Sequence, residues 1–172
     1  MTTSARAQRM LRVDQAGEFG ATRIYAGQLA VMGDRGPHTA QIRAMAAQEA
    51  DHKHDFDAML AARGGRPTLL QPIWKVAGFA LGAATALLGP EAAMACTAAI
   101  EEEIDQHYTR QLAELGDEDD ELAALIEQAR DDEREHRDTA LANGAERAPA
   151  YPLLAGAIRL GCKLAIGLSE RI

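Results

Sequence analysis

Six residues of this sequence have the types and the spacing of a metal site. They form two sets, and each set has a lone glutamate followed after 31 or 32 residues by a Glu-x-x-His segment. The residues are Glu18, Glu49 and His52 in the first set and Glu101, Glu133 and His136 in the second. Equivalent residues of the two sets are 83 or 84 positions apart, which indicates two halves of similar design. Four carboxylates would balance the charge of two divalent metal ions.

The six residues fall on apolar helix stripes. Glu101, for example, shares a face with Met94, Ile104 and Tyr108, because successive helical residues rotate by about 100°. A buried carboxylate is costly unless it is ion-paired, protonated or bound to metal. A lone Glu from each of two helices, with a Glu-x-x-His from each of two others, is the ligand set of ferritin-like di-iron and di-manganese proteins. Oxygen and imidazole donors without thiolate favour iron or manganese over structural zinc.

One ligand arrangement is predicted from this pattern. The bridging ligands between two ions are Glu49 and Glu133. The remaining ligands are Glu18 and His52 for one ion and Glu101 and His136 for the other. A single Glu-x-x-His is more often an exposed ion pair on a helix surface, so the prediction depends on the repetition.

Several polar neighbours of these residues receive other interpretations. Helical phase places Glu102 on the flank of the stripe and Glu103 on the opposite side, beside His107, where a solvated charged face is predicted. Tyr25 and Tyr108 face the core and are interpreted as packing residues, with a redox or proton-transfer role near the metals as the alternative.

Two aspartates and two further histidines are predicted to lie at the surface. Asp14 and Asp105 are each four residues from a lone glutamate, and the alternative for both is to accept hydrogen bonds from metal-bound histidines. His38 falls in a turn and His54 on the polar side of its helix.

The elements that carry these residues are predicted to be helices. Of the 172 residues, 47% are hydrophobic and 4% aromatic, a composition that favours helix over sheet. Breaks rich in Gly and Pro divide the chain into hairpins at about 8–62 and 91–142 and apolar segments at about 67–90 and 150–170. The predicted fold is all-α: a ferritin-like four-helix bundle with two additional apolar helices, forming a single domain over residues 1–172. Such a bundle brings all six candidate ligands into one layer.

The two apolar segments are predicted to lie in a membrane interface. Residues 76–89 are uncharged but too few for a transmembrane span of about 20 residues. In the C-terminal segment, Arg159, Lys163 and Arg171 are spaced to reach lipid headgroups. The alternative is that both segments are ordinary bundle helices or an oligomer interface.

Charge and cysteine content exclude other classes of protein. A net charge of -8 without a basic block argues against nucleic-acid binding. Cys96 and Cys162 lie far apart in apolar surroundings, so we expect buried free cysteines rather than a disulfide or a zinc site. The N-terminal stretch "MTTSARAQRM" has no apolar core of a signal peptide, and we expect the protein to stay in the compartment where it is made.

Five blocks of the sequence closely resemble the Coq7 family, the demethoxyubiquinone hydroxylases of ubiquinone biosynthesis. The blocks are "RVDQAGEFGATRIYAGQ" (12–28), "QEADH" (48–52), "MACTAAIEEEIDQHY" (94–108), "DDEREHRD" (131–138) and "APAYPLLAGAIRLGCKLAIGLSERI" (148–172). The resemblance implies a monooxygenase that hydroxylates 2-polyprenyl-3-methyl-6-methoxy-1,4-benzoquinol with O2 as co-substrate. It also places the family's two-iron ligands on the same six residues.

The resemblance implies further partners and a location. The sequence has no dinucleotide-binding glycine motif. Electrons would therefore come from NADH acting directly or from a separate reductase. The protein would be peripheral on the cytoplasmic face of a bacterial inner membrane, or on the matrix side of the mitochondrial inner membrane. A homo-oligomer and partners from ubiquinone biosynthesis are compatible with it. The competing functions are a bacterioferritin-like ferroxidase that stores iron, and a non-enzymatic helical module on a membrane whose acids form salt bridges.

Overall fold

Helices account for nearly all regular structure in the computed structural model, which describes residues 4–172. Residues 1–3, the start of the stretch in which no signal peptide is predicted, lie outside the described part. The elements are α1 (Ala5–Met32), α2 (Thr39–Ala62), α3 (Gln71–Leu87), α4 (Pro90–Leu115), α5 (Asp120–Ala142), the 3-10 helix η1 (Ala145–Arg147) and α6 (Tyr151–Ser169). Residues 4–172 contain no strand, which confirms the predicted all-α class.

Local sequence signals set where the helices begin and end. Ser4 caps α1 by accepting a hydrogen bond from the Ala7 amide, and Asp119 caps α5 in the same way through the Leu122 amide. Gly116 follows α4 with a positive φ of 51°, a conformation in which glycine lacks the steric penalty of other residues. These local signals account for the start of α1, the end of α4 and the start of α5.

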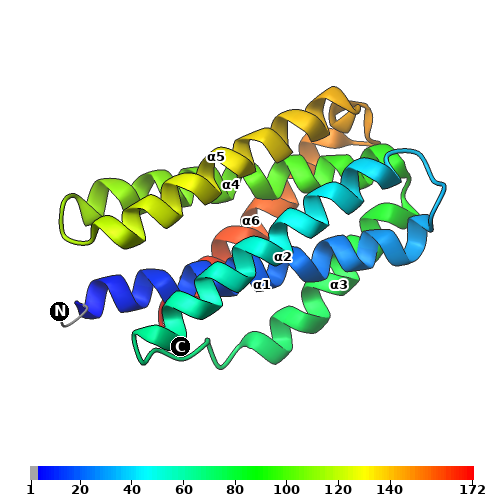
Figure 1. Cartoon of the computed structure of the whole chain (residues 1–172). Coiled ribbons are helices and arrows are strands. Elements are labelled where there is room, and N and C mark those ends of the chain that lie inside the picture. Colours follow the sequence, from blue (N-terminus) through cyan, green and yellow to red (C-terminus); the bar gives the residue numbers. More distant parts are fainter. Residues whose placement is uncertain (1–3) are drawn as a thin grey trace.

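Two antiparallel hairpins form the bundle (Figure 1). Helix α1 packs against α2 and α4 against α5, and the hairpins meet through contacts of α2 with α5 and of α1 with α4. Helix α3 packs along α1, and α6 packs along α4, so both lie outside the four-helix bundle. Helix α4 is the central element, and its segment 92–100 is entirely buried.

The packing of α3 on α1 requires glycine at the contact. A Cβ atom at Gly82 would overlap the carbonyl oxygen of Ile24, and one at Gly27 would overlap the carbonyl oxygen of Phe79. The backbones of the two helices therefore approach more closely than larger residues permit.

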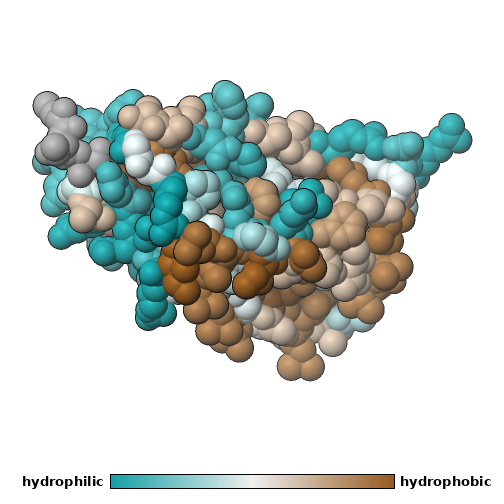
Figure 2. Space-filling model, turned by 90° about the horizontal axis from the view of Figure 1, so that it is seen from below, coloured by the Kyte–Doolittle hydropathy of each residue, from teal (hydrophilic) through white to brown (hydrophobic). Residues whose placement is uncertain are grey.

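Helices α3 and α6 expose large apolar side chains on one face of the molecule. The exposed residues of these helices and their flanks are Leu69, Ile73, Val76, Phe79, Leu87, Leu88, Leu153, Leu160, Leu164, Leu168 and Ile172. Figure 2 shows hydrophobic residues gathered on this face. Among the described residues, α6 is the one helix long and apolar enough to cross a membrane, by length and composition only, and a single helix of this kind is weak evidence for a span. We call this surface the apolar face.

Candidate metal centre

The six predicted ligands meet in the interior of the bundle, and all are buried. Each bundle helix contributes: α1 carries Glu18, α2 carries Glu49 and His52, α4 carries Glu101, and α5 carries Glu133 and His136. The Glu-x-x-His spacing places carboxylate and imidazole on one helix face, because residues three apart are neighbours there. The structure therefore brings together every residue of the predicted ligand set.

Candidate ligand atoms form two groups in which all atoms lie within 4.8 Å of one another. The first group is Glu18, Glu49, His52 and Glu133, and the second is Glu49, Glu101, Glu133 and His136. Glu49 and Glu133 belong to both groups. This geometry suits two ions with two shared carboxylates.

Many polar atoms of the cluster have no hydrogen-bond partner within residues 4–172, although burial makes this costly. They are Glu18 Oε2, both carboxylate oxygens of Glu49, His52 Nδ1, Glu101 Oε2 and Glu133 Oε1. His52 Nδ1 lies 3.3 Å from Glu133 Oε1 and 3.7 Å from Glu18 Oε2, so three donor atoms converge without forming hydrogen bonds. Unpartnered oxygen and nitrogen donors that converge in this way fit metal coordination.

Burial changes the acidity of the cluster. It raises the pKa of Glu18, Glu49 and Glu101, and the neighbouring carboxylates raise it further. Burial also opposes the ionisation of Glu133, but its hydrogen bond with His136 and the nearby His52 outweigh it and lower its pKa to about 2. For His52, burial is outweighed by the nearby carboxylates of Glu133 and Glu18, which raise its pKa to about 11. The metal-free cluster thus holds protons, which a bound cation would have to displace.

A tyrosine hydroxyl supports each lone glutamate. Tyr25 donates to Glu101 Oε1 at 2.8 Å, and Tyr108 donates to Glu18 Oε1. Burial raises the pKa of both tyrosines well above its ordinary value, so both remain protonated donors. The interpretation of these tyrosines as packing residues was therefore incomplete, because their hydroxyl groups orient candidate ligands.

The outer nitrogen of each histidine contacts a residue that the sequence reasoning missed. His52 Nε2 lies 2.9 Å from Asp132 Oδ2, and His136 Nε2 lies 2.9 Å from Gln48 Oε1. A signal was present in the sequence, since Gln48 and Asp132 each come directly before a predicted bridging glutamate and are 84 residues apart.

The two aspartates considered as hydrogen-bond acceptors for metal-bound histidines lie elsewhere. Asp14 is buried, and its Oδ1 is 3.3 Å from Nε2 of His107, so its predicted solvation is wrong. Asp105 accepts hydrogen bonds from Arg134 and Arg137 at the edge of the bundle. Neither aspartate contacts a candidate histidine ligand within the described residues.

The prediction of a solvated Glu103 is also wrong. Its side chain is 2% exposed, and its Oε1 lies 3.3 Å from Nζ of Lys163. Arg159 similarly pairs with the flank residue Glu102. Helix α6 causes both effects, because it covers the side of α4 that a plain four-helix bundle would leave in water. Two of the basic residues assigned to headgroups therefore bind acids of α4.

The remaining predictions concern histidines and cysteines. His54 is exposed and His38 precedes α2 in a turn, as predicted. Cys96 is buried, whereas Cys162 is only partly buried because it lines a cavity.

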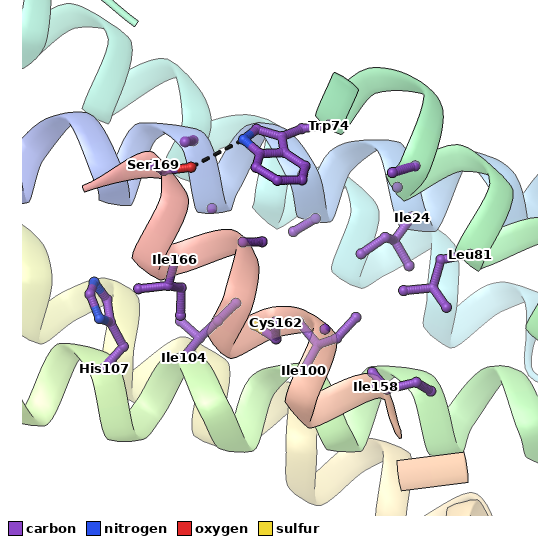
Figure 3. Close-up of a pocket in the computed structure, with 18 of the residues that line it drawn as sticks. Ile24, Trp74, Leu81, Ile100, Ile104, His107, Ile158, Cys162, Ile166 and Ser169 are labelled. Atoms are coloured by element: carbon purple, nitrogen blue, oxygen red, sulfur yellow. Dashed lines mark hydrogen bonds between the residues drawn. The ribbon is translucent and has the colours of Figure 1, made fainter. Parts of the chain in front are cut away.

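An apolar cavity of about 500 Å³ lies beside the cluster, between α1, α3, α4 and α6. Figure 3 shows Ile100 and Ile104 of α4 beside Ile158, Cys162 and Ile166 of α6 in the lining of this cavity. A hydrogen bond of 3.1 Å from Trp74 Nε1 to Ser169 Oγ joins α3 to α6 at one side of the cavity (Figure 3).

One side chain links the cavity to the candidate metal cluster. Tyr108 lines the cavity and donates its hydroxyl hydrogen bond to Glu18. His107 and Asp14 line the cavity close to Tyr108. Tyr108 therefore connects the lining of the cavity to the candidate ligand Glu18.

Comparison with known proteins gives a consistent result. Residues 5–169 match the family model described as "Ubiquinone biosynthesis protein COQ7". The chain is 60% identical over 164 residues to a "3-demethoxyubiquinol 3-hydroxylase" of Rhodospirillum rubrum, covering 95% of this chain and 77% of that protein. It is 53% identical over 171 residues to the mouse "NADPH-dependent 3-demethoxyubiquinone 3-hydroxylase, mitochondrial", covering 97% and 78%. A yeast "5-demethoxyubiquinone hydroxylase, mitochondrial" is 42% identical over 180 residues, covering 95% and 77%. The ligand pattern, the helical bundle and these matches together establish that the chain belongs to the Coq7 family.

Proposed function

We propose that this protein is a di-iron monooxygenase that hydroxylates demethoxyubiquinol, a polyprenyl benzoquinol, in ubiquinone biosynthesis. The observation that carries the proposal is the position of the buried cluster of four glutamates and two histidines beside a large apolar cavity. The names of the bacterial and mitochondrial relatives support the same reaction.

The proposed ligands follow the two groups of converging atoms. Glu49 and Glu133 are shared, and each ion receives one further glutamate and one histidine. The bound pair of irons supplies the activation of O2. The chain itself supplies four carboxylates that balance two divalent ions, tyrosine hydroxyls that orient the lone glutamates, and an interior that excludes water.

The cavity is the proposed place of the quinol ring. Its lining is almost wholly apolar, and three of its polar side chains, His107, Asp14 and Tyr108, lie close to one another and mark one end of it. We place the ring at this end, where Tyr108 adjoins Glu18, and the polyprenyl tail between α3 and α6. The tail then leaves the protein at the apolar face.

The apolar face is the proposed membrane contact. Leu153, Leu160 and Leu164 of α6 are each at least 60% exposed, an unfavourable arrangement in water that a lipid interface would relieve. Because Arg159 and Lys163 are paired with Glu102 and Glu103, we assign no headgroup contact to them. The protein is then peripheral to a membrane, on the cytoplasmic face in a bacterium.

The reductant is proposed from the relatives. The mouse and human proteins carry "NADPH-dependent" in their names, which supports a reduced nicotinamide nucleotide as the electron source, either directly or through a reductase. Iron storage, the alternative function, has no support among these names.

The decisive experiment is quinone profiling in a strain that lacks its own demethoxyubiquinol hydroxylase. Expression of this chain should restore ubiquinone and remove the accumulated demethoxy intermediate. Glu133→Ala should fail to do so, because it removes a shared ligand, whereas the exposed neighbour Glu135→Ala should succeed. Persistent accumulation with the unmodified chain present at normal levels would refute the proposed reaction.

Metal analysis separates the alternatives. The hydroxylase should hold about two irons per chain, the number that its ligand set can bind. A storage protein would form a cage with a large iron core. A non-enzymatic module would purify without metal and show no stabilisation by iron.

A further inference from the structure

The two halves of the metal cluster are matched at their lone glutamates. Glu18 on α1 receives a hydrogen bond from Tyr108 on α4, and Glu101 on α4 receives one from Tyr25 on α1. The exchange is reciprocal, and each donor is a neutral phenol in a buried position. The two tyrosine hydroxyl groups therefore orient the lone glutamates of the two ion positions in a similar way.

The halves differ at their histidines. In both, Nδ1 faces the candidate ligand carboxylates, and Nε2 points outward to a residue of the facing helix. For His52 this residue is Asp132, an anion, whereas for His136 it is Gln48, a neutral amide. Asp132 and Gln48 occupy equivalent positions of the 84-residue repeat. One position of the repeat thus holds different charges in the two halves.

Nearby basic side chains are occupied elsewhere. The only ion pair of Asp132 within residues 4–172 is with His52. Arg130 pairs with Asp131, and Arg134 pairs with Asp131 and Asp105. The Asp132 side chain is 26% exposed, so water screens it only in part.

An outer carboxylate strengthens a histidine ligand. When the N–H of a metal-bound imidazole donates to a carboxylate, the charge-assisted hydrogen bond makes the other nitrogen a stronger donor to the metal. A neutral amide holds the ring orientation but adds no charge. The outer partner therefore affects affinity in one half more than in the other.

We propose that Asp132 and Gln48 make the two metal positions unequal, so that the ion bound by Glu18 and His52 is held more tightly than the ion bound by Glu101 and His136. This inference rests on the proposed metal centre. It assigns Asp132 and Gln48 as positioning residues that act through the histidines, and it implies that the two ions load in a fixed order.

The test is an anaerobic calorimetric titration of the metal-free protein, residues 1–172, with Fe(II). The unmodified protein should show two binding steps of different affinity. Asp132→Asn keeps an acceptor oxygen but removes the charge, and it should weaken the tighter step by about 10- to 100-fold while changing the weaker step less. Asp131→Asn, which removes the same charge at a neighbouring exposed position without a histidine contact, should leave both steps unchanged.

A second variant adds a negative charge instead of removing one. Gln48→Glu adds a carboxylate beside His136 and should tighten the weaker step, so that the two affinities approach each other. If circular dichroism shows that Asp132→Asn does not fold, Gln48→Glu alone tests whether the two positions are unequal. Mössbauer spectra of samples loaded with one equivalent of ⁵⁷Fe should show one dominant ferrous site in the unmodified protein and a mixture of sites in either variant.

The outcomes distinguish this inference from the proposed function. If the unmodified protein binds no pair of irons, the proposed metal centre fails. If it binds two irons and hydroxylates the quinol, but its two steps are equal or do not respond to Asp132→Asn and Gln48→Glu, only the inequality of the two positions is overturned.

Discussion

The hydroxyl of Tyr25 on α1 donates a 2.8 Å hydrogen bond to Oε1 of Glu101 on α4, and both side chains are 1% exposed. The bond joins the two hairpins of the bundle at the metal cluster. It also holds one oxygen of a buried carboxyl group whose other oxygen has no hydrogen-bond partner within residues 4–172.

Removal of this hydroxyl should destabilise the metal-free protein. Tyr25→Phe leaves a buried acceptor unsatisfied, so we expect the free energy of unfolding to fall by about 1–3 kcal/mol. Urea denaturation followed by circular dichroism measures the change. Tyr151→Phe is the matched control, because the hydroxyl of Tyr151 makes no hydrogen bond within the described residues, and equal losses from both substitutions would contradict the prediction.

The stability of the metal-free protein should depend on pH in a defined direction. His52 has a pKa of about 11 in the folded protein, against an ordinary value of 6.5. Its stabilising contribution is complete below pH 6.5 and is lost as the pH rises toward about 11. The raised pKa values of Glu18, Glu49 and Glu101 act in the same direction, because the folded state holds protons that the unfolded state releases.

Urea denaturation of metal-free protein between about pH 7 and about pH 9 should therefore show a decreasing free energy of unfolding. His52→Gln should reduce the slope, whereas substitution of the exposed His54 by Gln should preserve it. A free energy that rises over this range would show that the cluster is not protonated as described.

A bulky side chain in the apolar cavity should block the substrate without disturbing the metals. Gly161 lines the cavity, and a Cβ atom there would meet no atom within 4 Å. We expect Gly161→Phe to lower kcat/KM by about tenfold or more, mainly through KM, because the ring occupies substrate volume.

The control is Gly156→Phe on the same helix, which also meets no atom within 4 Å but does not line the cavity. Both variants should retain about two irons per chain. An unchanged kcat/KM in Gly161→Phe would place the substrate elsewhere.

Charged substitutions on the apolar face should weaken membrane binding. Leu164 is 60% exposed on α6, and transfer of a leucine side chain into an apolar environment contributes roughly 1.5–3 kcal/mol. Leu164→Glu should therefore reduce binding to phosphatidylethanolamine–phosphatidylglycerol vesicles by about tenfold or more in a sedimentation assay. Leu141→Glu, at an exposed leucine of α5 outside the apolar face, is the matched control. Equal vesicle binding by the two variants would count against this face as the membrane contact.

Local sequence patterns were sufficient for much of the fold and for the composition of the candidate site. The breaks near Gly116 and Pro90 mark helix ends. Glycine allows backbone conformations that other residues avoid, and proline fixes φ at the start of a helix, and both effects are local. The six candidate ligands were found from residue type, helical period and the 84-residue repeat. Their metal-binding role and the single-domain organisation remain predictions, whereas their convergence is a property of the structure.

The contacts of residues other than the six candidate ligands became known only from the tertiary structure. Helical phase gave the direction of Glu103 correctly relative to Glu101, but it could not show that α6 lies on that side of α4 and buries Glu103 against Lys163. Asp132 and Gln48 were likewise visible as neighbours of glutamates, but their contacts cross from α5 to α2 and from α2 to α5. The sequence by itself determined which residues share a helix face, because that depends only on the local helical period. The tertiary structure decided what each face meets, because burial and hydrogen bonding depend on helices that are distant in the chain.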